Sequence, residues 1–200
     1  DGTEAGTMLV KDINAGTANS NPVSFMSLGN GQVLFQANDS VNGQELWVSD
    51  GTEAGTMLVK DIRAGSSSSS SSLVSALNNG SVLFKADDGV NGTELWVSDG
   101  TAAGTMLLKD INPGLSASSP DRFLSLANGQ VFFSANDGVN GYELWVTDGT
   151  AAGTMLVKDI NTGSGSSPSG GVLAIANGKV LFNATDGVNG YKLWVSDGTA

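Results

Sequence analysis

The chain has 200 residues, 40% of them hydrophobic, and a mean hydropathy of +0.00, so it can bury a core and fold. It carries 20 acidic against 9 basic residues, a net charge of -11, which argues against nucleic acid or an anionic membrane as a partner. Because it has no cysteine and no histidine, it lacks disulfides, thiolate nucleophiles, and the commonest general base and transition-metal ligand.

One phrase, DGT, returns at a fixed spacing along the whole chain. Each copy starts 49 residues after the last, at Asp1, Asp50, Asp99, Asp148 and Asp197. The same spacing separates the tryptophans (Trp47, Trp96, Trp145, Trp194) and the aspartates before GVNG or its variant (Asp39, Asp88, Asp137, Asp186). We therefore divide residues 1–200, a single repeat domain, into repeats 1–49, 50–98, 99–147 and 148–196.

Within residues 20–62, four short segments rich in β-branched and aromatic residues predict strands: PVSFMSLG, QVLFQAN, ELWVSD and GTMLVKDI. The connections NG, DSVNGQ and DGTEA predict three hairpins. The fourth connection is longer and of low complexity (NAGTANSN, RAGSSSSSSS, NPGLSASS and NTGSGSSPS), which indicates a crossover to the next unit. Each repeat is thus expected to form a four-stranded antiparallel meander.

A four-stranded sheet repeated every ~40 to 50 residues is typical of a β-propeller blade. A β-solenoid would use shorter coils, and a helical solenoid would need an apolar period of 3.6 residues, which these segments lack. We expect an all-β fold, a β-propeller built from four 49-residue, four-stranded blades. Strands apolar on both sides, such as TMLVKDI, fit sheets packed between neighbouring sheets.

The segments ELWVSDGTEAGT, ELWVSDGTAAGT, ELWVTDGTAAGT and KLWVSDGTA resemble the ELWxxDGT repeat, which is found in tandem in large, mostly bacterial proteins. The resemblance covers the whole chain and implies a β-propeller-like repeat protein that is secreted or displayed at the cell surface. The family carries the name of a repeat and not of an activity. Three residues depart from the pattern: Lys192 replaces the glutamate, Thr147 a serine and Ser40 a glycine.

The tryptophans, Trp47 and its three equivalents, have two interpretations. They stack on a flat ligand such as a sugar, or they pack between blades. We favour packing, because burying an indole removes about 150 to 250 Å² from water. The DGT aspartates are expected to accept hydrogen bonds within their own turns, since each turn offers too few oxygens for calcium.

The DGVNG loops are richer in oxygen, and Asp87 and Asp88 are adjacent there. Adjacent residues in a strand point to opposite faces, so we expect no shared metal, although calcium at these loops stays open. Lys11 with Asp12, and the equivalent lysines Lys60, Lys109 and Lys158 with their own aspartates, are expected to form surface ion pairs. No cofactor is expected.

Every recurring carboxylate recurs in equivalent positions, and repetition favours a scaffold or multivalent binding over catalysis. We expect a non-enzymatic scaffold and interaction module, whose crossover and second-hairpin loops share one face and bind a protein or cell-envelope partner. A multivalent glycan-binding propeller is the alternative, as is an engineered or excised propeller without a ligand of its own. A hydrolase using carboxylates is the weakest hypothesis.

The two ends of the chain are complementary. Residues 1–13 carry an outer strand without a preceding partner, whereas residues 169–196 form a sheet without its outer strand. Residues 1–13 can complete the last blade in the same chain or in a partner chain, and we expect a homodimer that closes an eight-bladed ring. An open fragment of a longer array is the competing interpretation. No membrane insertion is expected, since no apolar run approaches roughly 20 residues.

Overall fold

The computed structural model describes residues 2–199, apart from the side chain of Ser169. The first sheet contains β1 (Val23–Ser27), β2 (Val33–Asn38), β3 (Gln44–Ser49) and β4 (Met57–Lys60). The second contains β5 (Ser72–Ala76), β6 (Val82–Asp87), β7 (Thr93–Ser98) and β8 (Met106–Lys109). The third contains β9 (Asp121–Ser125), β10 (Val131–Asn136), β11 (Tyr142–Thr147) and β12 (Met155–Lys158). The fourth contains β13 (Pro168–Ala174), β14 (Val180–Thr185) and β15 (Tyr191–Ser196), with a 3-10 turn at Ala176–Gly178.

Each sheet is an antiparallel meander in which neighbours in sequence are neighbours in space. The predicted strands and hairpins of residues 20–62 are confirmed, and no α-helix occurs between residues 2 and 199. The first three sheets have four strands and the last has three, as the sequence predicts. Asp1, which opens the first DGT, lies outside the described residues.

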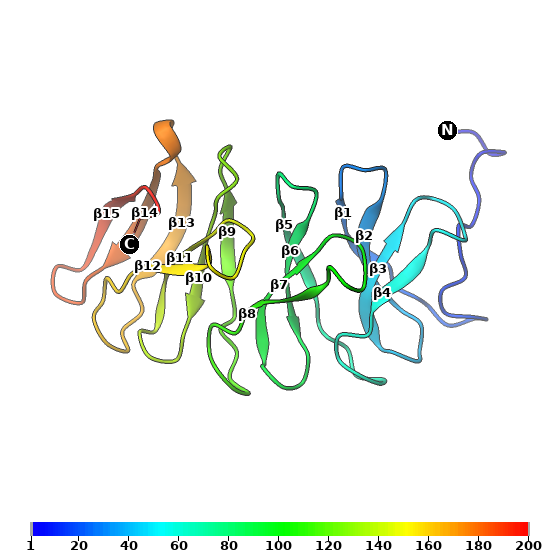
Figure 1. Cartoon of the computed structure of the whole chain (residues 1–200), viewed down its shortest axis with the longest axis horizontal. Helices are drawn as coiled ribbons and strands as arrows, with labels where there is room; N and C mark the ends of the chain where they lie inside the picture. The colour runs from blue at the N-terminus through cyan, green and yellow to red at the C-terminus, as the bar shows by residue number, and fades with distance from the viewer. Residues whose placement is uncertain (1, 200) are drawn as a thin grey trace.

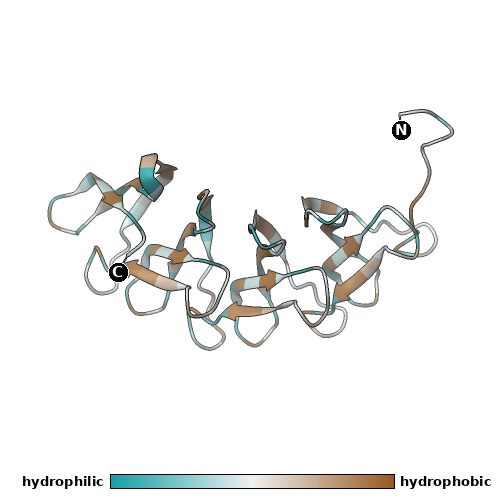
Figure 2. Ribbon diagram, turned by 45° about the horizontal axis from the view of Figure 1, so that its top comes forward, coloured by the Kyte–Doolittle hydropathy of each residue, from teal (hydrophilic) through white to brown (hydrophobic). Residues whose placement is uncertain are grey.

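The four sheets follow one another face to face in chain order, and the two chain ends lie at opposite ends of this row (Figure 1). The first strands of successive sheets, β1, β5, β9 and β13, contact one another. They therefore form the inner edge of the array, and the last strand of each sheet forms its outer edge (Figure 2). This is the arrangement of propeller blades, and the described chain is an open row of them.

The core lies between the sheets. One cluster joins Leu46 and Val48 of the first sheet to Phe84 and Trp96 of the second. Two further clusters join the second sheet to the third and the third to the fourth. Because the second and third sheets each lie between two other sheets, β6 and β10 are buried over most of their length, which explains their apolar character on both sides.

The crossover loops (residues 61–71, 110–120 and 159–167) pack against the DGVNG loops (residues 39–43, 88–92 and 137–141) of the preceding sheet. Gln44 N donates to Ser68 Oγ (3.0 Å) and Tyr142 N to Ser166 Oγ (3.1 Å). Gly43 has a positive φ of 72°, and a Cβ there would meet the backbone of Ser67. Only glycine allows this approach. The predicted shared face of these two loop sets is confirmed, and we call it the crossover-loop face.

None of the helical turns in residues 2–199 is long and apolar enough to cross a membrane.

Candidate functional site

The tryptophans are packed inside the protein. Trp47, Trp96 and Trp145 are each 6% exposed. Trp96 lies 6.1 Å from Phe84, between ring centroids, inside the cluster that joins the first two sheets. None of the three buried indole N–H groups has a hydrogen-bond partner in the protein, so these rings contribute through packing. This confirms the packing interpretation. Trp194 is half-buried, and its Nε1 donates to Ala184 O (3.0 Å).

The DGT aspartates organise their own turns. Asp50 Oδ1 accepts both the backbone N–H of Thr52 (2.9 Å) and its hydroxyl (2.7 Å), and Thr52 Oγ1 accepts Gly55 N (2.9 Å). The threonine hydrogen bonds lower the pKa of Asp50. A Cβ at Gly55 would overlap the carboxylate of Asp50, so a larger residue there would displace this carboxylate from the turn. The same network recurs at Asp99 and Asp148, which confirms the predicted turn chemistry.

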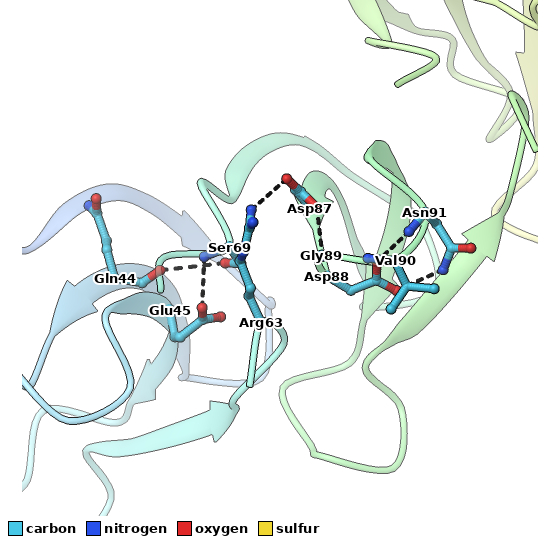
Figure 3. Close-up of polar contacts among 9 residues, drawn as sticks. All are labelled: Gln44, Glu45, Arg63, Ser69, Asp87, Asp88, Gly89, Val90 and Asn91. Atoms are coloured by element: carbon cyan, nitrogen blue, oxygen red, sulfur yellow. Dashed lines mark hydrogen bonds and ion pairs between the residues drawn. The ribbon is translucent and has the colours of Figure 1, made fainter. Parts of the chain in front are cut away.

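The DGVNG loops use their carboxylates in the same way. Asp88 Oδ1 accepts Val90 N (2.9 Å) and Asn91 N (2.8 Å), while Oδ2 accepts Asn91 Nδ2 (2.8 Å) (Figure 3). Burial raises the pKa of Asp88, but these hydrogen bonds outweigh it and hold the pKa below its usual value. In residues 2–199 no group of three acidic side chains could hold a metal ion.

The adjacent carboxylates Asp87 and Asp88 serve separate partners. Asp87 Oδ2 lies 2.6 Å from Arg63 Nη1 of the crossover loop, and Asp87 Oδ1 accepts Gly89 N (2.7 Å) (Figure 3). Each aspartate is therefore saturated by a different set of donors.

The expectation of surface ion pairs at Lys11, Lys60 and Lys109 is wrong. Lys60 Nζ donates to Thr105 O (2.8 Å) in the DGT turn of the next sheet, and Lys109 Nζ donates to Thr154 O (2.8 Å). Lys11 Nζ likewise reaches Thr56 O (2.8 Å). Each lysine donates to a backbone carbonyl of the neighbouring blade and not to the aspartate that follows it in sequence. Adjacent residues of a strand point to opposite faces, so this aspartate lies on the other face. These lysines fasten one blade to the next.

A second fastening comes from the glutamate of ELW. Glu45, Glu94 and Glu143 are completely buried. Glu45 Oε1 accepts Ser69 N of the crossover loop (2.7 Å) (Figure 3). Glu45 Oε2 accepts Ile62 N of the same loop (3.2 Å). Glu94 accepts Ile111 N (3.0 Å) and Ser118 N (2.8 Å). The carboxylate thereby satisfies backbone donors that would otherwise be buried without a partner.

Burial governs the ionisation of these glutamates. It raises the pKa of Glu45 to about 7, although hydrogen bonds from Ser69 and Ile62 act in the opposite direction. Burial also raises the pKa of Glu94, and that of Glu143 to about 7. These glutamates were not among the candidate residues predicted from the sequence. A signal was present in the sequence, because a carboxylate that recurs in three otherwise apolar strands needs buried partners.

Two basic residues that each occur in one repeat only, Lys85 and Arg122, lie in one hollow on the crossover-loop face. It has a volume of about 390 Å³ and is lined by Lys85, Ser119, Asp121, Arg122, Ser134, Tyr142, Ser166 and Pro168. Arg122 Nη1 donates to Pro168 O (3.1 Å) and Gly170 O (3.2 Å) of the last sheet. Lys85 Nζ lies 3.5 Å from Pro120 O. We call this site the polar hollow.

No protein-family model and no curated protein matches the sequence. Among solved structures, a mutant puromycin hydrolase complexed with PGG is similar (TM-score 0.52, 17% identity), with 92% of this chain and 28% of that chain covered. A putative TolB from Agrobacterium tumefaciens has a TM-score of 0.52 and 12% identity, covering 91% of this chain and 64% of that one. TolB from Acinetobacter baumannii has a TM-score of 0.50 and 15% identity, covering 90% and 42%.

This chain thus spans less than two thirds of each of these structures. At such identities the likeness concerns the fold alone. The likeness to the TolB structures supports a fold of the β-propeller type.

Proposed function

We propose that the chain is a non-enzymatic β-propeller scaffold that binds a protein partner through the crossover-loop face. One observation carries this proposal: Lys85 and Arg122, two basic residues that no other repeat has at these positions, lie together there. The position of Arg122 is occupied in the other repeats by Ser24, Leu73 and Gly171, and that of Lys85 by Gln36, Ser134 and Asn183. The blade cores, by contrast, are nearly identical. A constant frame with one variable surface is the division expected of a recognition module.

The chemistry of the polar hollow suits an acidic group. The chain has a net charge of -11, yet Lys85 and Arg122 both line this hollow. Arg122 is held in place by two carbonyls through one nitrogen, which leaves donors of its planar fork for a carboxylate. Asp121 and the hydroxyls of Ser119 and Tyr142 add acceptors and donors for the neighbouring backbone of a peptide. The partner proposed is therefore an acidic protein segment.

The carboxylates support a scaffold more than a hydrolase. The recurring aspartates accept hydrogen bonds inside their own turns, and the buried glutamates accept them from crossover loops. Catalysis by a carboxylate pair requires side chains directed at a common point in a pocket. The repeated carboxylates of this chain are directed at their own backbone.

Substitutions borrowed from the other repeats test this proposal without disturbing the fold. Arg122→Ser copies Ser24, and Lys85→Ser copies Ser134. We expect the wild type to bind acidic peptides on a peptide array and the double variant to lose that binding. Arg63→Asn, which copies Asn112 and removes a cation from the same face but outside the hollow, is the control and should bind as the wild type does. Equal binding by both variants would refute the role of the hollow.

The glycan-binding alternative is tested in parallel on a glycan array. The burial of Trp47, Trp96 and Trp145 removes the aromatic platforms on which this alternative was based. Binding to glycans alone would nevertheless favour it over a protein partner. Binding to neither array would favour an engineered or excised propeller without a ligand. The resemblance to the ELWxxDGT repeat supports a secreted or cell-surface setting.

A further inference from the structure

The fourth sheet presents an open edge and an open face at one end of the row. Leu193 and Val195 in β15 are 75% and 57% exposed, whereas the equivalent Leu144 and Val146 in β11 are 0% and 3% exposed. β11 pairs with β12, but β15 has no strand beyond it in the described chain. The apolar side chains at this end (Val157, Ile160, Phe182, Trp194 and Val195) line a groove of about 510 Å³.

The other end of the row presents the matching half. Residues 7–13 spell TMLVKDI, identical to residues 56–62 and 154–160, which supply the outer strands β4 and β12. The outer strand predicted within residues 1–13 is not formed in the single chain, because it has no neighbouring strand to pair with. Met8 and Leu9 are 74% and 79% exposed. Lys11 already fastens this segment to Thr56 O (2.8 Å). A groove of about 580 Å³ runs beside it, lined by the apolar residues Leu9, Val10, Ile13, Phe25, Val33 and Phe35.

We propose that the chain associates end to end with a second copy, residues 8–11 of one copy completing the fourth sheet of the other, and that Lys192 makes this seam weaker than the internal junctions. The register follows from the third sheet, where Trp145 pairs with Leu156 and Val146 with Met155. At the seam, Trp194 pairs with Leu9, and Val195 with Met8. Two copies related by a two-fold axis satisfy both open edges.

The internal junctions show that the apolar faces also match. The cluster between the third and fourth sheets combines Leu126, Leu144 and Val146 with Phe182 and Trp194. The equivalent residues at the seam are Ile175, Leu193 and Val195 of one copy with Phe35 and Trp47 of the other, all of them apolar. The exposed Lys158 of one copy is placed to donate to Thr7 O of the other copy. The equivalent contact within one chain is that of Lys109 with Thr154 O.

One residue breaks the match. At each internal junction a buried glutamate accepts two N–H groups of the next crossover loop. In the first crossover loop the equivalent groups are Ile13 N and Ser20 N, and the residue that reaches them across the seam is Lys192. An ammonium group has donors and no acceptor. These two donors therefore lose water on association without gaining a partner, which weakens the seam.

Two variants test the proposal by mass measurement in the analytical ultracentrifuge. The wild-type chain should sediment as a species of twice 20.2 kDa that dissociates on dilution. Leu9→Pro removes a backbone N–H from the pairing segment and should abolish this species without unfolding the monomer, because residue 9 lies outside every strand. Lys192→Glu should lower the dissociation constant by about tenfold, because it restores the missing acceptor.

Ala102→Glu, in the DGT turn of the second sheet and away from both ends, copies the exposed Glu53. It adds negative charge outside the seam, so it is the control and should leave the dissociation constant unchanged. A wild type and a Lys192→Glu variant that are both monomeric at all concentrations would overturn the proposal. Dimers that survive Leu9→Pro would overturn the seam, and polymers that grow with concentration would overturn the two-fold pair. An unchanged or larger dissociation constant in Lys192→Glu would overturn the role of Lys192. None of the residues substituted here lines the polar hollow, so this test is separable from that of the proposed function.

Discussion

Acidification to about pH 5 should stabilise this protein, because its buried glutamates bind protons more tightly when folded. Burial raises the pKa of Glu45 and Glu143 from 4.5 to about 7. A group whose pKa is raised on folding contributes its full stability below the unfolded pKa and loses it as the pH rises through the folded pKa. The free energy of unfolding should therefore fall between pH 4.5 and pH 7.

The size of this change in the free energy of unfolding follows from the pKa shifts of the two glutamates. One pKa unit corresponds to about 1.4 kcal/mol, so each of the two glutamates accounts for about 3 kcal/mol between the two ends of this range. The aspartates of the DGT turns and DGVNG loops act in the opposite direction, since their pKa values are lowered. Their contribution is lost only below about pH 4. The two effects are therefore separated on the pH axis, with maximum stability near pH 5.

Urea unfolding at pH 5 and pH 8 measures this difference. Glu45→Gln with Glu143→Gln keeps an acceptor for the crossover loop but removes the titration, so the double variant should lose most of the pH dependence. Glu53→Gln changes an exposed glutamate and should retain it. A free energy of unfolding that stays constant or rises from pH 5 to pH 8 in the wild type would refute the reasoning.

Three further predictions concern single features of the blades. Trp96→Ala should destabilise the protein by roughly 3 to 5 kcal/mol, as measured by urea unfolding, and Trp194→Ala by clearly less, since Trp194 is only half-buried; equal losses would argue against packing between blades. Removal of calcium by a chelator should leave the melting temperature unchanged, because the DGVNG aspartates are saturated by N–H groups, and a drop reversed by calcium would contradict this. Gly104→Ala should lower the melting temperature, because the new Cβ overlaps the carboxylate of Asp99, and an unaltered value would show that the turn can relax.

The elements of the fold follow from local sequence. Glycine, asparagine and aspartate mark the turn of every hairpin. Because the pattern repeats every 49 residues, each strand and turn is predicted from several copies of the same segment. The role of Trp96 followed from its size and apolar surroundings. These are properties of a single blade, which is why the sequence was sufficient for them.

The contacts between blades were harder to predict. Lys60 was expected to pair with Asp61 beside it, whereas its partner is Thr105 O, 45 residues away. The role of Glu45 was not predicted, because its partners lie in a crossover loop of low complexity. The polar hollow was also missed, since Lys85, Arg122 and Tyr142 come from three strands and converge only when the blades are stacked. Such contacts depend on the packing of whole sheets, which periodicity does not specify.

The number of blades in a crystal structure of the assembled protein tests the proposed architecture most directly. We predict eight blades in one closed ring, made of two chains, with residues 8–11 of each chain forming the outer strand of the other chain's fourth sheet. A closed ring of four blades from one chain, or a lone row with β15 unpaired, would contradict it.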